Sequence, residues 1–237
     1  MKYLKIHICL VLFVGLCHSA QAQSRFNRVR QHINTENAKP LLSFLDSCLF
    51  KNYQRDSALF FKGLVNLRIN QTVEAIRYHK LLANEFPEFW EAHYLQGLIY
   101  YIQKRYHESI FELSQVLKKN PKDWRAYYDR ALAFGQLDEA NAAIEDLNHC
   151  IAIHPRFAAA YYSRAYYYES LGILKEAIRD YEHNIVLEPK NFEAYIGLAY
   201  VYQNQKNTSM ACEVIQKAIQ QGSQAALEMK VNFCKGD

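Results

Sequence analysis

The sequence lacks the short motifs by which many enzyme active sites can be recognised. It contains no G-x-S-x-G nucleophile turn, no Walker phosphate loop, no H-E-x-x-H zinc motif and no G-x-G-x-x-G dinucleotide loop. Carboxylates scattered along helices usually form a solvated face. We therefore expect a protein that is not an enzyme, has no catalytic residues and uses no cofactor.

Metal-binding patterns are lacking as well. The nine histidines show no tight ligand spacing. His149 and His183 lie 34 residues apart in equivalent places, but two ligands do not make a zinc site, which takes three or four. We expect surface histidines and no metal site.

The chain has little excess charge and few long apolar runs. The formal net charge is +4, and without the first 22 residues 26 basic and 24 acidic residues remain, a net charge of +2. Proteins that bind nucleic acid usually carry a strongly basic domain or face, so we expect no nucleic-acid partner. The apolar run at residues 8–16 is shorter than the roughly 20 residues that a bilayer span needs. The mature chain is therefore not expected to span a membrane.

The first 22 residues have the order of a secretory signal peptide. Two lysines precede the apolar run, and the small residues of Ala-Gln-Ala at positions 20–22 follow it. We expect cleavage after Ala22 and a periplasmic or secreted protein. Lipid attachment at Cys17 is the less favoured alternative, because bacterial lipoproteins need a small residue before the cysteine and Leu16 is not small.

Proline is scarce, and its placement is regular. Four of the five prolines are spaced by 34 residues: Pro87, Pro121, Pro155 and Pro189. This is the length of a helix–turn–helix unit that buries its apolar face by stacking on a copy of itself. The period predicts five units, at residues 56–89, 90–123, 124–157, 158–191 and 192–222.

Small residues recur at fixed places in these units. The three small columns are Ala58, Ala92, Ala126, Ala160 and Ala194; Gly63, Gly97, Ala131, Ala165 and Ala199; and Ala75, Ser109, Ala143, Ala177 and Ala211. Small residues at matched places let two helix backbones approach closely, with bulky residues between them. Each second helix is expected to end just before its proline, whose ring removes an amide donor.

This pattern resembles the tetratricopeptide repeat, whose motif is W-x2-L-G-x2-Y, then A-x3-F, then P. Matching residues in the last two units are Tyr161, Ala165, Tyr168, Ala177, Tyr181 and Pro189, then Tyr195, Leu198, Ala199, Tyr202, Ala211 and Ile215. The resemblance implies an all-α fold, a right-handed solenoid of antiparallel helix pairs that binds partners. The departures are Ser223, where the other four units have proline, and Asn66 and His79, where the other four units have bulky apolar or aromatic residues. Such departures are expected of terminal units.

The regions on either side of the repeats also carry helical patterns. Residues 23–55 resemble a degenerate helix pair, with an apolar stripe at Phe26, Val29 and Ile33 and with Pro40 opening the second helix. Residues 223–237 are expected to form a capping helix and tail. Their apolar stripe consists of Leu227, Val231 and Cys234.

Two charged columns vary together. Arg130 precedes Asp146 by 16 residues, and Arg164 precedes Asp180 by the same distance. In the next unit both columns are apolar, with leucine at 198 and valine at 214. Removing only one partner of a contacting pair would strand a charge. We predict two salt bridges within repeats rather than acid–base dyads, because arginine does not release its proton.

Four cysteines follow the expected cleavage site: Cys48, Cys150, Cys212 and Cys234. Cys48 and Cys150 lie three units apart, about 30 Å at roughly 10 Å per helix pair. A disulfide needs Cα atoms within about 7 Å, so only the pairing of Cys212 with Cys234 joins neighbouring helices. We predict that disulfide, with two buried thiols as the alternative.

The first helices carry a ladder of aromatic and aliphatic residues, which the resemblance places on the concave face. The predicted partner-binding residues are Phe60, Leu64, Tyr94, Leu98, Tyr101, Arg125, Tyr128, Leu132, Tyr162, Tyr166 and Tyr200. Tyrosine offers large contact area at low entropy cost, plus a hydroxyl group for orientation. We expect a peptide or protein segment as ligand. Packing of these tyrosines against the next repeat is the alternative for the first column.

Other functions stay open from the sequence. The chain could be an accessory subunit of an envelope assembly that uses its convex face, or a carbohydrate-binding protein, since stacked tyrosines also suit sugars. Some related repeats hold a partner's C-terminal carboxylate with lysine and asparagine, but here those places hold aromatics and leucines. The sequence gives no oligomeric state.

Overall fold

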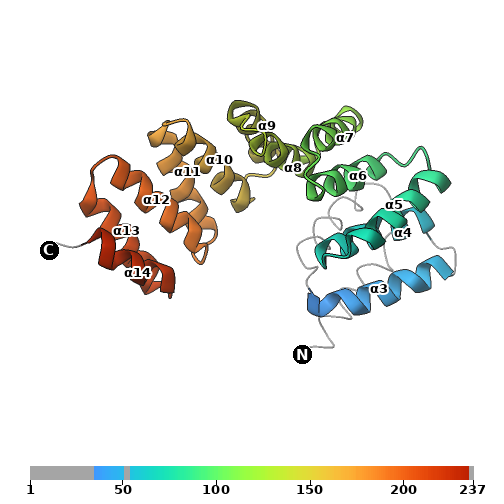
Figure 1. Ribbon diagram of the computed structural model, residues 1–237, viewed down its shortest axis with the longest axis horizontal. Coiled ribbons are helices and arrows are strands. Elements are labelled where there is room, and N and C mark those ends of the chain that lie inside the picture. Colours follow the sequence, from blue (N-terminus) through green and yellow to red (C-terminus); the bar gives the residue numbers. More distant parts are fainter. Residues whose placement is uncertain (1–34, 51–53, 235–237) are drawn as a thin grey trace. The chain divides into compact units, whose positions relative to one another are not determined.

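The structure is a computed structural model that describes residues 35–50 and 54–234 (Figure 1). Within these ranges the chain forms twelve α-helices, α3 to α14, and no strand. This is the all-α, helical-repeat fold that the sequence predicts. The predicted signal peptide, Cys17 and the stripe of Phe26, Val29 and Ile33 lie outside the described residues.

The chain divides into two compact units after Gln103, and each is described by itself. Unit 1 contains α3 (Thr35–Phe50), α4 (Arg55–Arg68), α5 (Thr72–Glu85) and α6 (Glu91–Ile102). Helix α4 contacts the other three helices, and its residues 58–67 are all buried. The core of unit 1 therefore lies around α4.

Helix α3 differs from the expectation at its start. It begins at Thr35 and continues through Pro40, whereas the sequence predicts that Pro40 opens a helix. Ala38, Leu45 and Cys48 are all buried and follow helical spacing on both sides of the proline. Burial of this stripe outweighs the one backbone hydrogen bond that the proline ring removes.

Unit 2 continues the alternation of first and second helices. It contains α7 (Tyr106–Lys119), α8 (Trp124–Gly135), α9 (Ala140–Ile153), α10 (Ala158–Ser170), α11 (Leu174–Leu187), α12 (Phe192–Asn204), α13 (Thr208–Gln220) and α14 (Gln224–Phe233). Consecutive helices are in contact, and α10 also touches α8 and α12. The first helices α8, α10 and α12 thus form a row.

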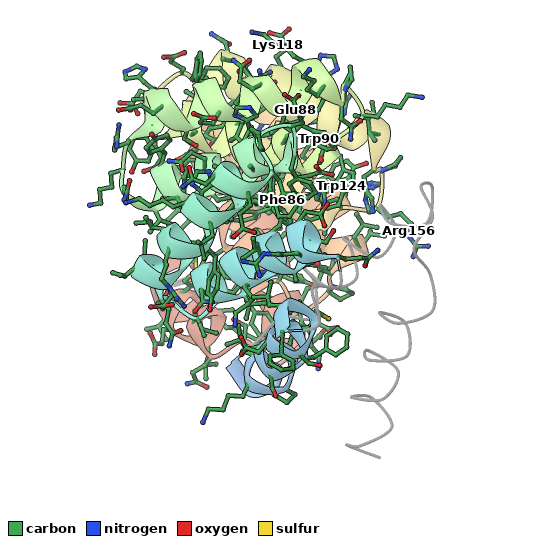
Figure 2. The ribbon with its side chains drawn as sticks, turned by 90° about the vertical axis from the view of Figure 1, so that its right-hand side faces the viewer. Phe86, Glu88, Trp90, Lys118, Trp124 and Arg156 are labelled. Carbon is green, nitrogen blue, oxygen red and sulfur yellow. A yellow bond between two sulfur atoms is a disulfide. The ribbon has the colours of Figure 1, made fainter. Side chains whose placement is uncertain are left out.

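Aromatic residues fill the space between consecutive repeats of unit 2. Trp124 at the start of α8, labelled in Figure 2, is buried. Its ring centroid lies 4.7 Å from that of His154 and 4.7 Å from that of Phe157, which precede α10. These contacts join one repeat to the next.

The prolines end the second helices as expected. The residue before each of the four spaced prolines has φ between −131° and −137°, outside the helical range: Phe86, Asn120, His154 and Glu188. The proline ring disfavours helical backbone at the preceding residue. The 34-residue spacing of the prolines therefore marks where the second helix of each repeat ends.

The turn inside each repeat has its own period. One residue per repeat takes a left-handed backbone, with φ between 59° and 73°: Asn70, Lys104, Asp138, Gly172 and Lys206. Glycine adopts this conformation without strain, whereas lysine does not. Because the five residues share no chemistry, the sequence alone does not reveal this column.

Candidate functional site

Two arginines tie together three consecutive helices each in unit 2. Arg130 of α8 donates from Nε and Nη2 to the two carboxylate oxygens of Asp146 on α9, at 2.7 Å each. Its Nη1 donates to Ser114 Oγ on α7 at 2.8 Å. Arg164 of α10 forms the same arrangement in the next repeat. It donates to the two carboxylate oxygens of Asp180 on α11 at 2.6 and 2.8 Å, and to Asn148 Oδ1 on α9 at 2.6 Å.

Aromatic rings enclose these ion pairs. The Arg130 guanidinium carbon lies 5.8 Å from the ring centroids of both Tyr127 and Phe134. The Arg164 guanidinium has the same relation to Tyr161 and Tyr168, at 5.7 and 5.8 Å. Both salt bridges are present as the sequence places them. They are structural, because a guanidinium held in this way keeps its proton.

The structure corrects the prediction that Arg125 contacts a partner. Arg125 is only 3% exposed and forms a buried ion pair with Asp123, Nε to Oδ1 at 2.8 Å. Asp123 also caps α8 by accepting from the backbone amides of Arg125 and Ala126. The arginine therefore holds the helix cap and is not at the surface.

The ladder residues of α4 and α6 also need a correction. Phe60 is fully buried, and Leu64 and Tyr94 are 6% and 2% exposed. The Phe60 ring packs edge-on against Phe61 and Phe89, with centroids 5.7 and 6.0 Å away. These three residues belong to the core of unit 1, and for Phe60 and Tyr94 of the first column this favours the packing alternative. Leu98 and Tyr101 on α6 are half-buried.

The ladder of unit 2 reaches the surface. Its predicted members on the first helices, hereafter the tyrosine face, are Tyr128, Leu132, Tyr162, Tyr166 and Tyr200. Tyr166 on α10 is 57% exposed and Tyr200 on α12 is 46% exposed, whereas the other three are half-buried. Tyr162 and Tyr166 are one helical turn apart, so they share a side of α10. Tyr166 and Tyr200 occupy the same column on helices that touch.

Two members of the tyrosine face pack against aromatic rings of the protein. The Tyr128 ring lies edge-on to Phe157, and the Tyr162 ring lies edge-on to Tyr181 of α11, with centroids 4.8 and 5.8 Å apart. Such edge-to-face pairs fix ring orientation. The half-buried tyrosines are therefore held in place, while the exposed edge is open to solvent.

Tyr181 also fixes a carboxylate beside the tyrosine face. Its side chain is 1% exposed, and its hydroxyl donates to Glu169 Oε2 at 2.9 Å. Gly197 of α12 leaves room for the phenol, because a Cβ at that position would lie 2.5 Å from Tyr181 Cζ. Burial raises the pKa of Tyr181 above its usual range, and the nearby Glu169 adds to this. Tyr181 therefore stays a hydrogen-bond donor.

Two carboxylates lie near the tyrosine face at Tyr162. Burial raises the pKa of Tyr162, and the carboxylates of Glu193 and Glu169 raise it further. The basic side chains of α8, α10 and α12 are Arg125, Arg130 and Arg164, and each is bound to an aspartate through two nitrogens. The carboxylates bordering the face are therefore not matched by arginines of its own helices.

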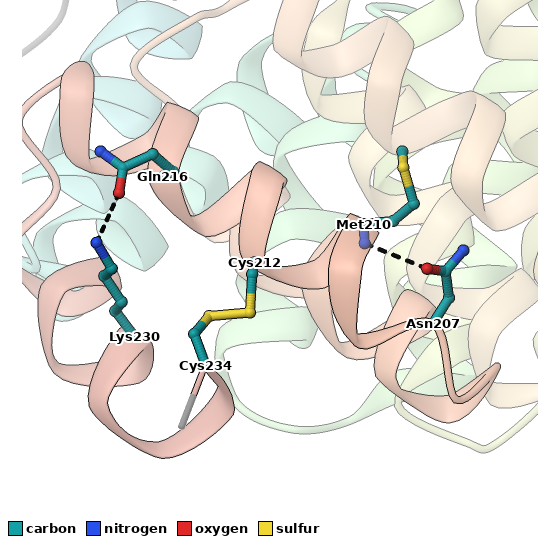
Figure 3. The surroundings of a disulfide bond; sticks show 6 residues. All are labelled: Asn207, Met210, Cys212, Gln216, Lys230 and Cys234. Carbon is teal, nitrogen blue, oxygen red and sulfur yellow. Dashed lines mark hydrogen bonds between the residues drawn. A yellow bond between two sulfur atoms is a disulfide. The ribbon is translucent and has the colours of Figure 1, made fainter. Parts of the chain in front are cut away.

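Cys212 on α13 and Cys234 after α14 form a disulfide, with Cα atoms 5.8 Å apart (Figure 3). This is the pairing that the sequence predicts. Lys230 donates to Gln216 Oε1 at 2.9 Å and links the same two helices. Cys48 and Cys150 are buried free thiols in different units. The disulfide ties the last helix to the repeats.

Within residues 35–50 and 54–234, no group of three or more His, Cys, Asp or Glu side chains is placed to hold a metal ion. No helix in the same part of the chain is long and apolar enough to cross a bilayer.

The family model of the tetratricopeptide repeat matches three segments, residues 90–123, 125–157 and 192–221. The chain contains tetratricopeptide repeats. The matched segments overlap the predicted repeats at 90–123, 124–157 and 192–222. A search of curated proteins finds no match to this sequence.

Solved structures of other repeat proteins resemble the chain. A crystal structure of MamA is 26% identical, with a TM-score of 0.61 over 72% of this chain and 97% of that chain. MamA from Desulfovibrio magneticus RS-1 is 21% identical, with a TM-score of 0.62 over 70% of this chain and 94% of that one. The tetratricopeptide repeat protein YrrB is 17% identical, with a TM-score of 0.61 over 78% and 97%. At these lower identities the likeness concerns the fold alone.

Two residues of the site are missing from the sequence-based set. Tyr181 occupies a position of the repeat motif that indicates a core residue. Glu169 lies three residues after Tyr166 but is not aromatic, so the pattern of the ladder does not include it. The sequence does carry one indication of this contact. Gly197 is a glycine at a position where the other four repeats have larger residues. A glycine inside a helix often marks a close approach by another group.

Proposed function

We propose that the protein is an extracytoplasmic scaffold that binds a segment of another protein on the tyrosine face of unit 2. The observation that carries this proposal is the pair Tyr166 and Tyr200, which expose 57% and 46% of their surface on adjacent helices. Single exposed apolar residues are ordinary, whereas larger contiguous apolar patches often mark interaction sites. Tyrosine is enriched among residues that dominate protein interfaces.

The repeat fold supports a protein or peptide ligand. Stacked repeats present extended surfaces that are preformed, so binding orders little of the scaffold. YrrB is described as having an unusual peptide-binding site, which illustrates that a protein of this fold can carry one. The ligand contacts of the present chain are proposed from its own exposed tyrosines.

Two features support a location outside the cytoplasm. The first 22 residues have the basic, apolar and small-residue order of a signal peptide. The disulfide between Cys212 and Cys234 suits an oxidising compartment, because disulfides are rare in proteins kept reduced.

The test is affinity capture from a cell-envelope extract with the purified protein as bait. The variant Tyr166→Ala/Tyr200→Ala changes the exposed tyrosines. The control His149→Ala/His183→Ala changes two exposed residues on the second helices, where each histidine ring packs against a tyrosine ring. Circular dichroism of all three proteins should show the same helix content.

We expect a partner that the wild type and the histidine variant retain and the tyrosine variant loses. A partner lost only by the histidine variant would contradict the proposal. It would move the interface to the second helices and favour an accessory subunit of an envelope assembly. A glycan array that binds the protein through Tyr166 and Tyr200 would replace the protein ligand by a carbohydrate.

A further inference from the structure

We infer that the segment bound on the tyrosine face carries lysine or arginine side chains toward the carboxylates of Glu169 and Glu193. This inference rests on the proposed function and names the chemistry of its ligand. Three observations carry it: the charge around the face, the way the chain binds its own arginines, and the fixed position of one carboxylate.

The charge around the face favours a basic ligand. The first helices of unit 2 hold three arginines, and each is already bound to an aspartate within the protein. Glu193 is exposed, Glu169 is half-buried, and both act electrostatically on Tyr162. Electrostatic complementarity across an interface steers association and rejects partners of the same sign.

The protein itself shows how such groups bind a guanidinium. Arg130 and Arg164 each lie between two aromatic rings at 5.7 to 5.8 Å and donate to one carboxylate. The tyrosine face offers the same kinds of group, because Glu169 and Glu193 both act electrostatically on Tyr162, which lies one helical turn from Tyr166. Cations are attracted to aromatic faces, and charge-assisted hydrogen bonds to carboxylates are strong.

One carboxylate is positioned in advance. The buried Tyr181 hydroxyl donates to Glu169 Oε2 at 2.9 Å, and Gly197 provides the space that this contact requires. The other oxygen of Glu169 is not used in this bond. A fixed acceptor reduces the ordering that binding requires, which strengthens recognition of one cationic side chain.

The experiment is selection of a displayed random 12-residue peptide library on the purified wild-type protein, followed by affinity measurements on synthetic copies of the enriched peptides. The test variant is Glu169→Gln/Glu193→Gln, which removes two charges but keeps a hydrogen-bond acceptor for Tyr181. The control Glu145→Gln/Glu228→Gln removes the same charge from exposed positions on α9 and α14. Tyr166→Ala/Tyr200→Ala reports whether a peptide uses the tyrosine face at all.

We expect enriched peptides rich in lysine and arginine. Their affinity should fall about tenfold in the test variant, remain within about twofold in the control and weaken as salt screens the charges. Two results would overturn this inference and leave the proposed function standing. The peptides could require Tyr166 and Tyr200 for binding but carry no basic residues, or they could bind the test variant as tightly as the wild type. Peptides that bind regardless of both tyrosines, or a selection that enriches none, would overturn both.

Discussion

The same columns of the repeat have opposite roles in the two units. Leu64 of α4 and Tyr166 of α10 occupy one column, yet Leu64 is buried in the core and Tyr166 is mostly exposed. Residues 58–67 of α4 are buried on every side, including Lys62 and Asn66, whereas α10 buries only part of its circumference. A helix that is apolar all round is enclosed, and a helix with an apolar stripe keeps one face free. A repeat column thus identifies equivalent backbone positions without deciding which are covered.

The largest expected difference between the two units is the loss of folding stability when an aromatic residue of the ladder is replaced by alanine. Phe60→Ala should destabilise unit 1 by about 3–5 kcal/mol, because it leaves a cavity in a packed core. Tyr166→Ala should change the stability of unit 2 by about 0.5 kcal/mol or less, since most of that side chain is in water. Hydrogen exchange read separately in α4 and α10 would measure both. Equal losses at the two positions would contradict the comparison.

The next comparison concerns two repeats of unit 2 that differ at one pair of equivalent positions. One repeat has the ion pair of Arg164 with Asp180, and the next has Leu198 and Val214. Arg164→Leu alone should cost about 3–5 kcal/mol, because it leaves Asp180 buried without its partner. Arg164→Leu/Asp180→Val copies the residues found at 198 and 214 and should stay within about 1 kcal/mol of wild type. Thermal unfolding of both variants measures this. A double variant as damaged as the single one would show that the pair has a role beyond its charge.

Acid should weaken unit 1 through His79. Burial lowers the pKa of His79 to about 4 from an ordinary value of 6.5. The folded protein therefore resists protonation that the unfolded chain accepts, so stability falls as the pH drops from about 6.5 to about 4 and then levels off. The loss should reach at most about 3 kcal/mol. His79→Gln should flatten this dependence in hydrogen exchange of α5, and an unchanged profile would exclude His79 as its source.

The smallest effect concerns the left-handed residue in each turn. Lys206→Gly should stabilise the last repeat by about 1 kcal/mol, because glycine adopts a φ of 59° without strain. Gly172→Ala at the equivalent position should destabilise by a similar amount. Chemical denaturation compares the two. A destabilising glycine at 206 would mean that the lysine side chain contributes more than its backbone strain removes.

Much of the fold could be predicted from the sequence, because the spaced prolines and small columns report helix ends and close helix contacts. The paired columns of Arg130 with Asp146 and of Arg164 with Asp180 likewise predict the ion pairs, and register alone selects Cys212 and Cys234. The prolines, the small residues and the paired charges recur at equivalent positions, and at each position one physical reason accounts for the residue type.

The site was less predictable because solvent exposure is not a property of a column. Phe60 and Tyr162 occupy equivalent positions in their repeats. Phe60 is a core residue because neighbouring helices enclose α4, whereas Tyr162 is part of the tyrosine face. Arg125 follows Asp123 by two residues, and their buried pairing is local geometry that periodicity does not report. The bond from Tyr181 to Glu169 joins two columns of different repeat helices and depends on Gly197 of a third.

The most direct test of the central claim is photo-cross-linking inside cells with benzoylphenylalanine placed at position 166. The same probe at position 145, an exposed place on the second helix α9, is the control. The proposed tyrosine face predicts a discrete protein adduct from position 166 and none from position 145. An adduct from 145 with none from 166 would show that the partner meets the second helices and that Tyr166 is not part of the interface.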